Sequence, residues 1–268
     1  MARDFDLDLG LALQLADVAD AISLRRFNQS TEIVVKADGS PVTSADLEIE
    51  RELRARIGTE RPADGILGEE FGQANQGHSG DLPTWTIDPI DHTRHFIRGN
   101  PEYATIISLI VEGRPRVGVV SAPGLGRRWH ASEGSGAWSS GKRITVSHVG
   151  TLASAHLAIA GHREWIERYD WAGVSALLDT VAYPCGTAGG FLPGMLVATA
   201  QLDAFVEPWG SKWDHAATAI IVQEAGGRAS TICGGVAAGG SLLVSNGALH
   251  DQLLAFFATR SNFEKVEE

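Results

Sequence analysis

The stretch Trp85-Thr86-Ile87-Asp88-Pro89-Ile90-Asp91-His92-Thr93 decides how the rest of the sequence is interpreted. Its first three residues predict a short apolar strand, and residues 93–97 predict a short helix. The two carboxylates between them, Asp88 and Asp91, would meet the Thr93 hydroxyl and the N–H groups that a helix start leaves free. The plainer interpretation is that Asp88 caps a turn and Asp91 caps the helix.

Two further acidic side chains stand at similar places along the chain. Glu69 follows a strand predicted at residues 65–67, and Asp214 begins a helix predicted at residues 214–224. Loops at strand ends are where α/β folds bind ligands. Mg²⁺ prefers oxygen ligands, and two ions about 3.5–4 Å apart stabilise both the attacking and the leaving oxygen of a phosphoryl transfer. Because the sequence has no Cys or His cluster with zinc spacing, it favours an oxygen-liganded metal.

Charge and composition limit the possible partners. The 268 residues carry a formal net charge of −11, which repels nucleic-acid backbones and anionic membranes. No apolar run approaches the roughly 20 residues of a membrane span, and the N-terminus lacks the basic and apolar segments of a signal peptide. Two cysteines, Cys185 and Cys233, are too few for a disulfide framework. We therefore expect a cytoplasmic protein that binds neither nucleic acid nor membrane.

Hydrophobic periodicity predicts a mixed α/β (α+β) chain. The main helices are expected at residues 5–27, 44–57, 188–200 and 214–224. The first half carries antiparallel strands, the last of them at residues 144–146, whereas the second half alternates strands and helices. This order predicts a layered sandwich. We expect one domain over residues 1–268, with subdomains of about 1–145 and 146–268.

Several short stretches together carry a family resemblance along nearly the whole chain. They are Lys36 with Pro41-Val42-Thr43-Ser44-Ala45-Asp46, Gly68-Glu69-Glu70, the 85–91 stretch, Gly118-Val119-Val120, Gly186-Thr187-Ala188, Trp213-Asp214-His215-Ala216-Ala217 and Glu224-Ala225-Gly226-Gly227. With them the chain resembles the inositol monophosphatase family of magnesium-dependent, lithium-sensitive phosphatases. The resemblance implies a five-layered αβαβα sandwich, a homodimer, and hydrolysis of a small phosphomonoester by two-metal activation of water.

Residue roles follow from that resemblance. It implies two Mg²⁺ ions, with a third and weaker one near Glu69, held by Glu69, Asp88, the main-chain carbonyl of Ile90, Asp91 and Asp214. Asp46 and Thr93 would orient and deprotonate the attacking water, and Glu69 is expected with them among the catalytic residues. The main-chain N–H groups of His92 and Thr93 would bind phosphate. Lys36 either tunes the field of this pocket or is a solvated strand charge.

His92 departs from the family pattern, in which this position is ordinarily glycine. Its imidazole either enters the pocket and contacts substrate or weakens catalysis. The neighbouring Arg94, His95 and Arg98 could add positive charge for an anionic substrate, but a solvated helix face is the favoured interpretation.

Substrate contacts are expected from Gly186, Thr187 and Glu207, although Glu207-Pro208 could instead be a strand-end turn. Residues 96–99, 119–123 and 127–129 resemble bacterial histidinol-phosphate phosphatases of this fold, which makes histidinol phosphate the lead substrate.

Other substrates and functions stay open at this point. Cys185-Gly186-Thr187 is closer to inositol phosphatases. Inositol 1-phosphate, or a nucleoside 5′-phosphate or sugar phosphate of a specialised pathway, is therefore an alternative substrate. A non-catalytic protein that binds a phosphate ligand is the alternative from another functional class. An aspartyl-nucleophile phosphatase and a 3′-phosphoadenosine 5′-phosphate phosphatase are further alternatives.

Overall fold

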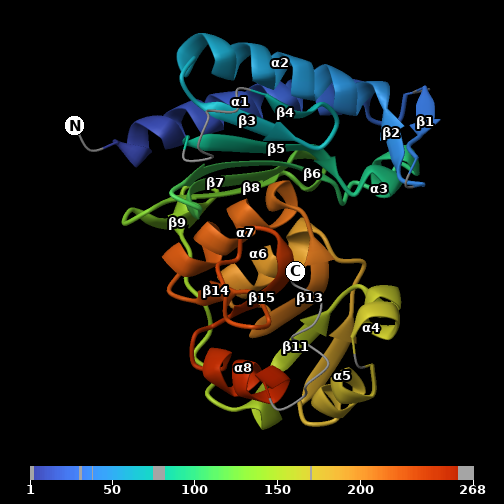
Figure 1. The fold of residues 1–268 in the computed structure, drawn as a ribbon, viewed down its shortest axis with the longest axis vertical. Coiled ribbons are helices and arrows are strands. Elements are labelled where there is room, and N and C mark those ends of the chain that lie inside the picture. The colour runs from blue at the N-terminus through green and yellow to red at the C-terminus, as the bar shows by residue number, and fades with distance from the viewer. Residues whose placement is uncertain (1–2, 30–31, 38, 75–81, 170, 259–268) are drawn as a thin grey trace.

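The computed structural model describes residues 3–29, 32–37, 39–74, 82–169 and 171–258. Its helices and sheets lie in five layers, which from the top of Figure 1 downwards are helices, sheet, helices, sheet and helices. The αβαβα sandwich expected from the sequence is confirmed.

The outer helical layer consists of α1 (Phe5–Arg26) and α2 (Ser44–Glu60). The α2 residues Ala45, Ile49, Leu53 and Ile57 recur every four positions and are fully buried. This spacing gives the helix one apolar face, which packs on the first sheet. A hairpin of β1 (Ile33–Val35) and β2 (Pro41–Thr43) lies between the two helices in the chain.

The first sheet has eight strands in the order β10-β9-β8-β7-β6-β5-β3-β4. Its strands are β3 (Gly65–Gly68), β4 (Gly72–Ala74), β5 (Thr84–Asp91), β6 (Ala104–Val111), β7 (Arg114–Ala122), β8 (Arg127–Ser132), β9 (Gly136–Ser139) and β10 (Lys142–Arg143). Among the described residues of this sheet, β3 and β5 are the one pair of neighbouring strands that run parallel. Strand β6 is buried along nearly its whole length because helices cover both faces of the sheet.

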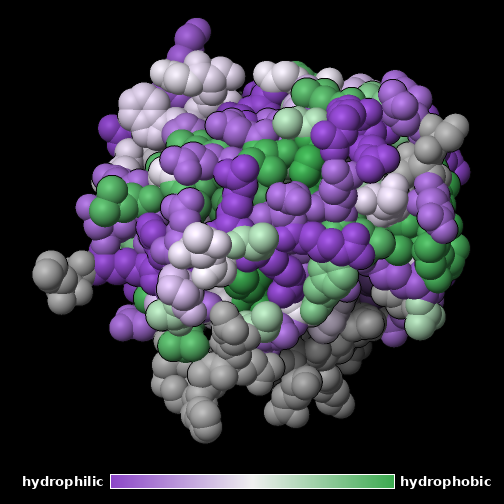
Figure 2. Space-filling view, turned by 90° about the horizontal axis from the view of Figure 1, so that it is seen from above, coloured by the Kyte–Doolittle hydropathy of each residue, from purple (hydrophilic) through white to green (hydrophobic). Residues whose placement is uncertain are grey.

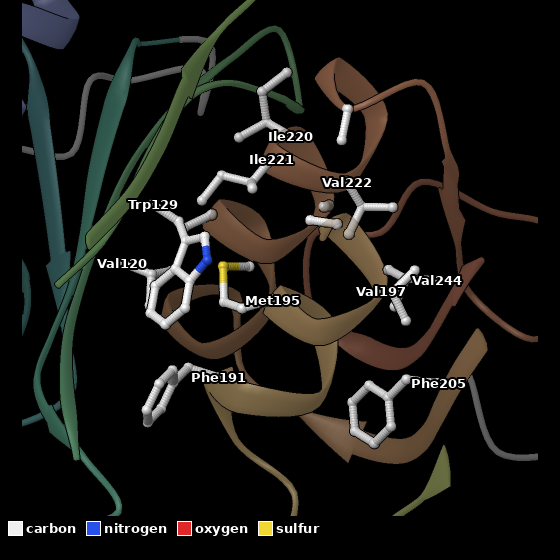
Figure 3. Packing of buried hydrophobic residues seen from close by; sticks show 14 of the residues in the cluster. Val120, Trp129, Phe191, Met195, Val197, Phe205, Ile220, Ile221, Val222 and Val244 are labelled. Atoms are coloured by element: carbon white, nitrogen blue, oxygen red, sulfur yellow. The ribbon is translucent and has the colours of Figure 1, made fainter. Parts of the chain in front are cut away.

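The middle layer consists of α6 (Phe191–Ala198) and α7 (Lys212–Glu224). Figure 3 shows Val120 and Trp129 of the first sheet facing Phe191 and Met195 of α6, with Ile221 of α7 in the same cluster. All five side chains are fully buried. This core fixes where α6 and α7 begin relative to the ends of β3 and β5.

The second sheet has five strands in the order β12-β11-β13-β15-β14. They are β11 (His156–Ile159), β12 (Tyr183–Gly186), β13 (Ala204–Gly210), β14 (Arg228–Ser230) and β15 (Gly240–Ser245). The last helical layer holds α4 (His162–Arg168), α5 (Trp171–Leu178) and α8 (His250–Ala258) (Figure 1).

Two element predictions were wrong. Residues 144–146 are not a strand, because β10 ends at Arg143 and Val146 N–H bonds instead to the carbonyl of Ala225. The helix expected at 188–200 begins only at Phe191, because Gly189 and Gly190 adopt positive φ angles of 87° and 68° that an α-helix excludes. Residues 75–81 and 259–268 lie outside the described part of the chain.

The face above α1 and α2 presents mainly hydrophilic residues, with hydrophobic ones scattered among them (Figure 2). Across the described residues, no helix is both long and apolar enough to span a bilayer.

Candidate active site

The carboxylates named from the sequence gather where β3 and β5 end. The parallel register places Gly68 beside Ile87, and Glu69 N–H donates to the Ile87 carbonyl at 3.1 Å. Glu69 therefore stands next to Asp88. The pairing of β5 with β6 shifts register between Asp88 and Asp91, so a bulge re-aims these side chains out of the ladder.

Asp214 reaches the same place from the middle helical layer, and a donor from that layer holds Asp91 at the end of β5. Asp214 lies in the first turn of α7, where its Oδ2 accepts the Ser211 N–H at 2.6 Å. Asp91 Oδ2 accepts the Phe191 N–H at 2.7 Å, across one hundred residues of sequence. Main-chain donors thus hold one oxygen of each carboxylate.

Electrostatics show that these carboxylates crowd one another. The pKa of Asp88 is raised well above its usual range, first by burial and then by the negative charges of Glu69, Asp91 and Asp214. Burial is also the main cause that raises the pKa of Asp214 to about 7, and Asp91 and Glu69 raise it further. Asp88 Oδ1 is buried and has no hydrogen-bond partner among the described residues.

This donor set fits a divalent cation. A buried carboxylate with an orphaned oxygen, surrounded by like charges, is costly unless a positive charge compensates it. All the converging donors are oxygens, which is the preference of hard ions such as Mg²⁺. The predicted ligand Ile90 is fully buried, and its carbonyl accepts a hydrogen bond from Thr93 Oγ1 at 3.0 Å.

Asp46 lies at the start of α2 with one oxygen held and one free. Its Oδ2 accepts the Thr43 N–H at 2.9 Å and the Thr43 hydroxyl, which forms the capping box of the helix. Its Oδ1 is buried without a partner among the described residues. Burial raises the pKa of Asp46 to about 6, and the charge of Glu69 contributes in the same direction. No hydrogen bond within the described chain joins Asp46 to Thr93, the predicted partner.

Lys36 is part of the site and not a solvated strand charge. Its Nζ lies 2.8 Å from both Glu69 Oε1 and Glu70 Oε1. These partners raise the pKa of Lys36 against the opposing effect of its burial. The pKa of Glu70 is raised to about 7, mainly by burial, so a cation beside these acids offsets part of their repulsion.

His92 has the left-handed backbone that glycine would adopt more easily, with φ at 65°. For a non-glycine residue this conformation costs on the order of 1 kcal/mol. The imidazole packs edge-on against His95 and Phe191, with ring centroids 4.5 Å and 6.0 Å away. The side chain is therefore folded into the protein and is only 11% exposed.

The segment Gly189-Gly190-Phe191, which sequence reasoning missed, links the carboxylates to the predicted substrate side. Gly189 packs against the Glu207 carboxylate, while Gly190 packs against His92 and Asp91. Two adjacent glycines before an apolar helix were the available signal, because such a pair allows close backbone approach.

The predicted substrate contacts stand around that segment. Glu207 Oε2 lies 3.2 Å from His215 Nε2, and its side chain is 15% exposed. Thr187 Oγ1 accepts the Gly189 N–H at 2.9 Å. Gly186 and Thr187 line a cavity of about 230 Å³.

We expect Gly190→Ala to lower phosphatase activity by about 10–100-fold, because small misplacements of catalytic groups cost that much. A Cβ at Gly190 would lie 2.6 Å from Asp91 Oδ2 and 2.5 Å from His92 Nε2, so the carboxylate must move. Gly126→Ala is the matched control, since Gly126 has a similar φ of 63° but open space around its Cβ position. Equal kcat/KM values for the two variants would contradict the prediction.

Comparisons with known proteins agree with this geometry. The model of the inositol monophosphatase family matches residues 7–261. A histidinol-phosphatase of Mycobacterium tuberculosis is 43% identical over 255 residues, which cover 92% of this chain and 96% of the relative. A histidinol-phosphatase of Streptomyces coelicolor is 41% identical and covers 96% of this chain and 99% of its own.

A solved structure gives the same result for the fold. An inositol monophosphatase from Zymomonas mobilis superposes with a TM-score of 0.82 at 28% identity, and the match covers 96% of this chain and 100% of that one. The chain therefore belongs to the inositol monophosphatase family and is a phosphomonoester hydrolase of a family that is generally metal-dependent.

Proposed function

We propose that this protein hydrolyses histidinol phosphate and uses magnesium to do so. The observation that carries the chemistry is Asp88, a buried aspartate whose neighbours Glu69, Asp91 and Asp214 are all negatively charged. Two relatives above 40% identity carry the name histidinol-phosphatase, which supports the substrate.

The proposed ligands divide into two sets that share Asp88. One ion would be held by Glu69, Asp88 and the Ile90 carbonyl, and a second by Asp88, Asp91 and Asp214. A third and weaker ion would bind near Glu69. When bound, magnesium activates water and stabilises the negative charge of the phosphate. The orphaned Asp88 oxygen supports this assignment.

The attacking water is positioned by Asp46 and Thr93. Thr93 uses its own proton in the bond to the Ile90 carbonyl, so its oxygen presents lone pairs to a water. Asp46 keeps Oδ1 free of protein partners among the described residues, and this atom takes the water proton. With a pKa of about 6, Asp46 is ionised and able to accept a proton at neutral pH. The main-chain N–H groups of His92 and Thr93 hold the phosphate.

The remainder of the substrate lies towards Gly186, Thr187 and Glu207. Histidinol phosphate carries a primary amine, which is positively charged at neutral pH, and inositol 1-phosphate carries only hydroxyls. A carboxylate at Glu207 therefore favours the first ester through a charge-assisted hydrogen bond.

We expect Glu207→Gln to lower kcat/KM for histidinol phosphate by about 10–100-fold, the value of a hydrogen bond to a charged group. Hydrolysis of inositol 1-phosphate, if measurable, should change much less, because an amide still accepts from a hydroxyl. Glu112→Gln, at an 82% exposed side chain, is the control. An equal loss of kcat/KM for both esters would contradict a contact between Glu207 and the substrate amine.

The proposed function is tested by phosphate release with and without Mg²⁺. The panel is histidinol phosphate, inositol 1-phosphate, nucleoside 5′-monophosphates and sugar phosphates. We expect the highest kcat/KM for histidinol phosphate. A higher kcat/KM for another ester would contradict histidinol phosphate as the substrate and leave the proposed reaction unchanged. If the folded, metal-loaded protein hydrolyses none of the esters, the result would support a non-catalytic phosphate-binding function.

The homodimer implied by the family resemblance is part of the same proposal. Sedimentation should give about twice the chain mass of 28.5 kDa. A sedimentation mass near 28.5 kDa would contradict the homodimer.

A further inference from the structure

His92, His95 and Glu102 form a group of side chains beside the carboxylate cluster and separate from it. One ligand atom from each of the three lies within 4.8 Å of the other two. Glu102 Oε1 is 3.6 Å from His92 Nδ1 and 3.8 Å from His95 Nδ1. His95, expected on a solvated helix face, is instead 27% exposed and turned towards His92.

The hydrogen bonds of the two imidazoles leave each of them a ring nitrogen that can bind a metal ion. Both ring nitrogens of His92 are buried and have no hydrogen-bond partner among the described residues. His95 Nδ1 lies 3.0 Å from the Glu102 carbonyl oxygen. A histidine ligand commonly donates its second ring N–H to such a carbonyl, which orients the ring and leaves the lone pair of Nε2 available.

We propose that His92, His95 and Glu102 bind a borderline-soft divalent cation of the Zn²⁺ class, in addition to the ions of the carboxylate cluster. Two imidazoles and one carboxylate suit Zn²⁺ or Co²⁺ and not Mg²⁺. Bonds of about 2.0–2.1 Å in a tetrahedron place ligand atoms about 3.3–3.4 Å apart. The three ligand atoms lie within 4.8 Å of one another, so side-chain movements of up to about 1.5 Å bring them to this geometry, and the fourth position is left to water.

The positions of the three ligands along the chain explain why their spacing in the sequence did not indicate a metal site. They also indicate what a bound ion would do. His92 and His95 belong to the start of α3 (Thr93–Ile97), whereas Glu102 lies beyond a turn, just before β6. Asp91 pairs with Ala104 at the start of β6. An ion here ties the turn that follows Asp91 to the segment before β6, and it adds positive charge one residue away from Asp91.

The test measures Zn²⁺ binding by equilibrium dialysis against the full chain in excess Mg²⁺, which keeps the carboxylate cluster occupied. We expect about one Zn²⁺ per chain, and an affinity at least about tenfold weaker in His95→Gln and in Glu102→Gln. His156→Gln is the control, since His156 is exposed and lies on β11. Co²⁺ should give visible absorption bands that the first two variants lose and the control keeps.

The site is refuted if His95→Gln and Glu102→Gln bind Zn²⁺ as tightly as His156→Gln, and the group is then an ordinary contact of two imidazoles with Glu102. Far-ultraviolet circular dichroism and retained Mg²⁺-dependent phosphate release show that a variant is folded. The readout is metal binding, so failure of the proposed substrate would not affect it, and loss of Zn²⁺ binding would leave the proposed reaction standing.

Discussion

Replacing Asp88 by asparagine should lower metal-dependent phosphate release by about 10³-fold or more, which corresponds to about 4 kcal/mol of lost transition-state stabilisation. Asp88 is the shared member of both proposed ligand sets, and it is 2% exposed. An amide keeps its size and removes its charge. Asp17→Asn is the charge-matched control, because Asp17 is 69% exposed on the outer helix α1.

The same substitution should stabilise the protein when metal is absent. The charges of Glu69, Asp91 and Asp214 repel an ionised Asp88, and asparagine removes that repulsion. Calorimetry in EDTA should therefore give a higher Tm for Asp88→Asn than for wild type, and added Mg²⁺ should raise Tm much less in the variant. Lower activity together with a lower metal-free Tm would mean that Asp88 is needed for the fold and would contradict this explanation.

The metal-free protein should also be less stable at about pH 8 than at about pH 5, with Tm lower by about 5–10 °C. Asp46, Glu70 and Asp214 have pKa values of about 6, 7 and 7, all above their unfolded values. Between about pH 4 and pH 7 the native state thus binds more protons than the unfolded state. Stability falls as pH rises through this window.

Two histidines, His250 and His130, act in the opposite direction. The pKa of His250 is lowered to about 4 by burial, so its contribution to stability rises between about pH 4 and pH 6.5. Burial, with the charge of Arg128, also lowers the pKa of His130. Three carboxylates outweigh these two imidazoles, and the net change remains a loss. Mg²⁺ should raise Tm more at pH 8 than at pH 5, because protons compete for the same oxygens. An equal or higher metal-free Tm at pH 8 would show that the carboxylates do not crowd one another as described.

Much of this site could be predicted because its residues follow local rules. Asp88 and Asp91 end an apolar strand, and Asp46 and Asp214 stand in the first turn of amphipathic helices. Their periodicity and caps are visible in sequence. The order of the motifs along the chain indicated the family, and the family resemblance implied the layered fold.

Contacts across layers could not be predicted in the same way. The Phe191 N–H reaches Asp91 only because Gly189 and Gly190 delay the start of α6, and helix propensity alone placed that start earlier. Glu102 meets His92 only because the turn before β6 folds back on α3. Neither contact has a period or a spacing that a single sequence displays.

The two capping boxes have a consequence for how the site can be observed. Asp46 closes the first turn of α2 through Thr43, and Asp214 closes the first turn of α7 through Ser211, each with one oxygen. Of these two residues Asp214 is a proposed metal ligand, so an ion bound by its other oxygen would act on the hydrogen-bonded Ser211 amide at the start of α7. The rate at which the Ser211 amide proton exchanges with deuterium should therefore report whether the metal site is occupied, with no substrate present.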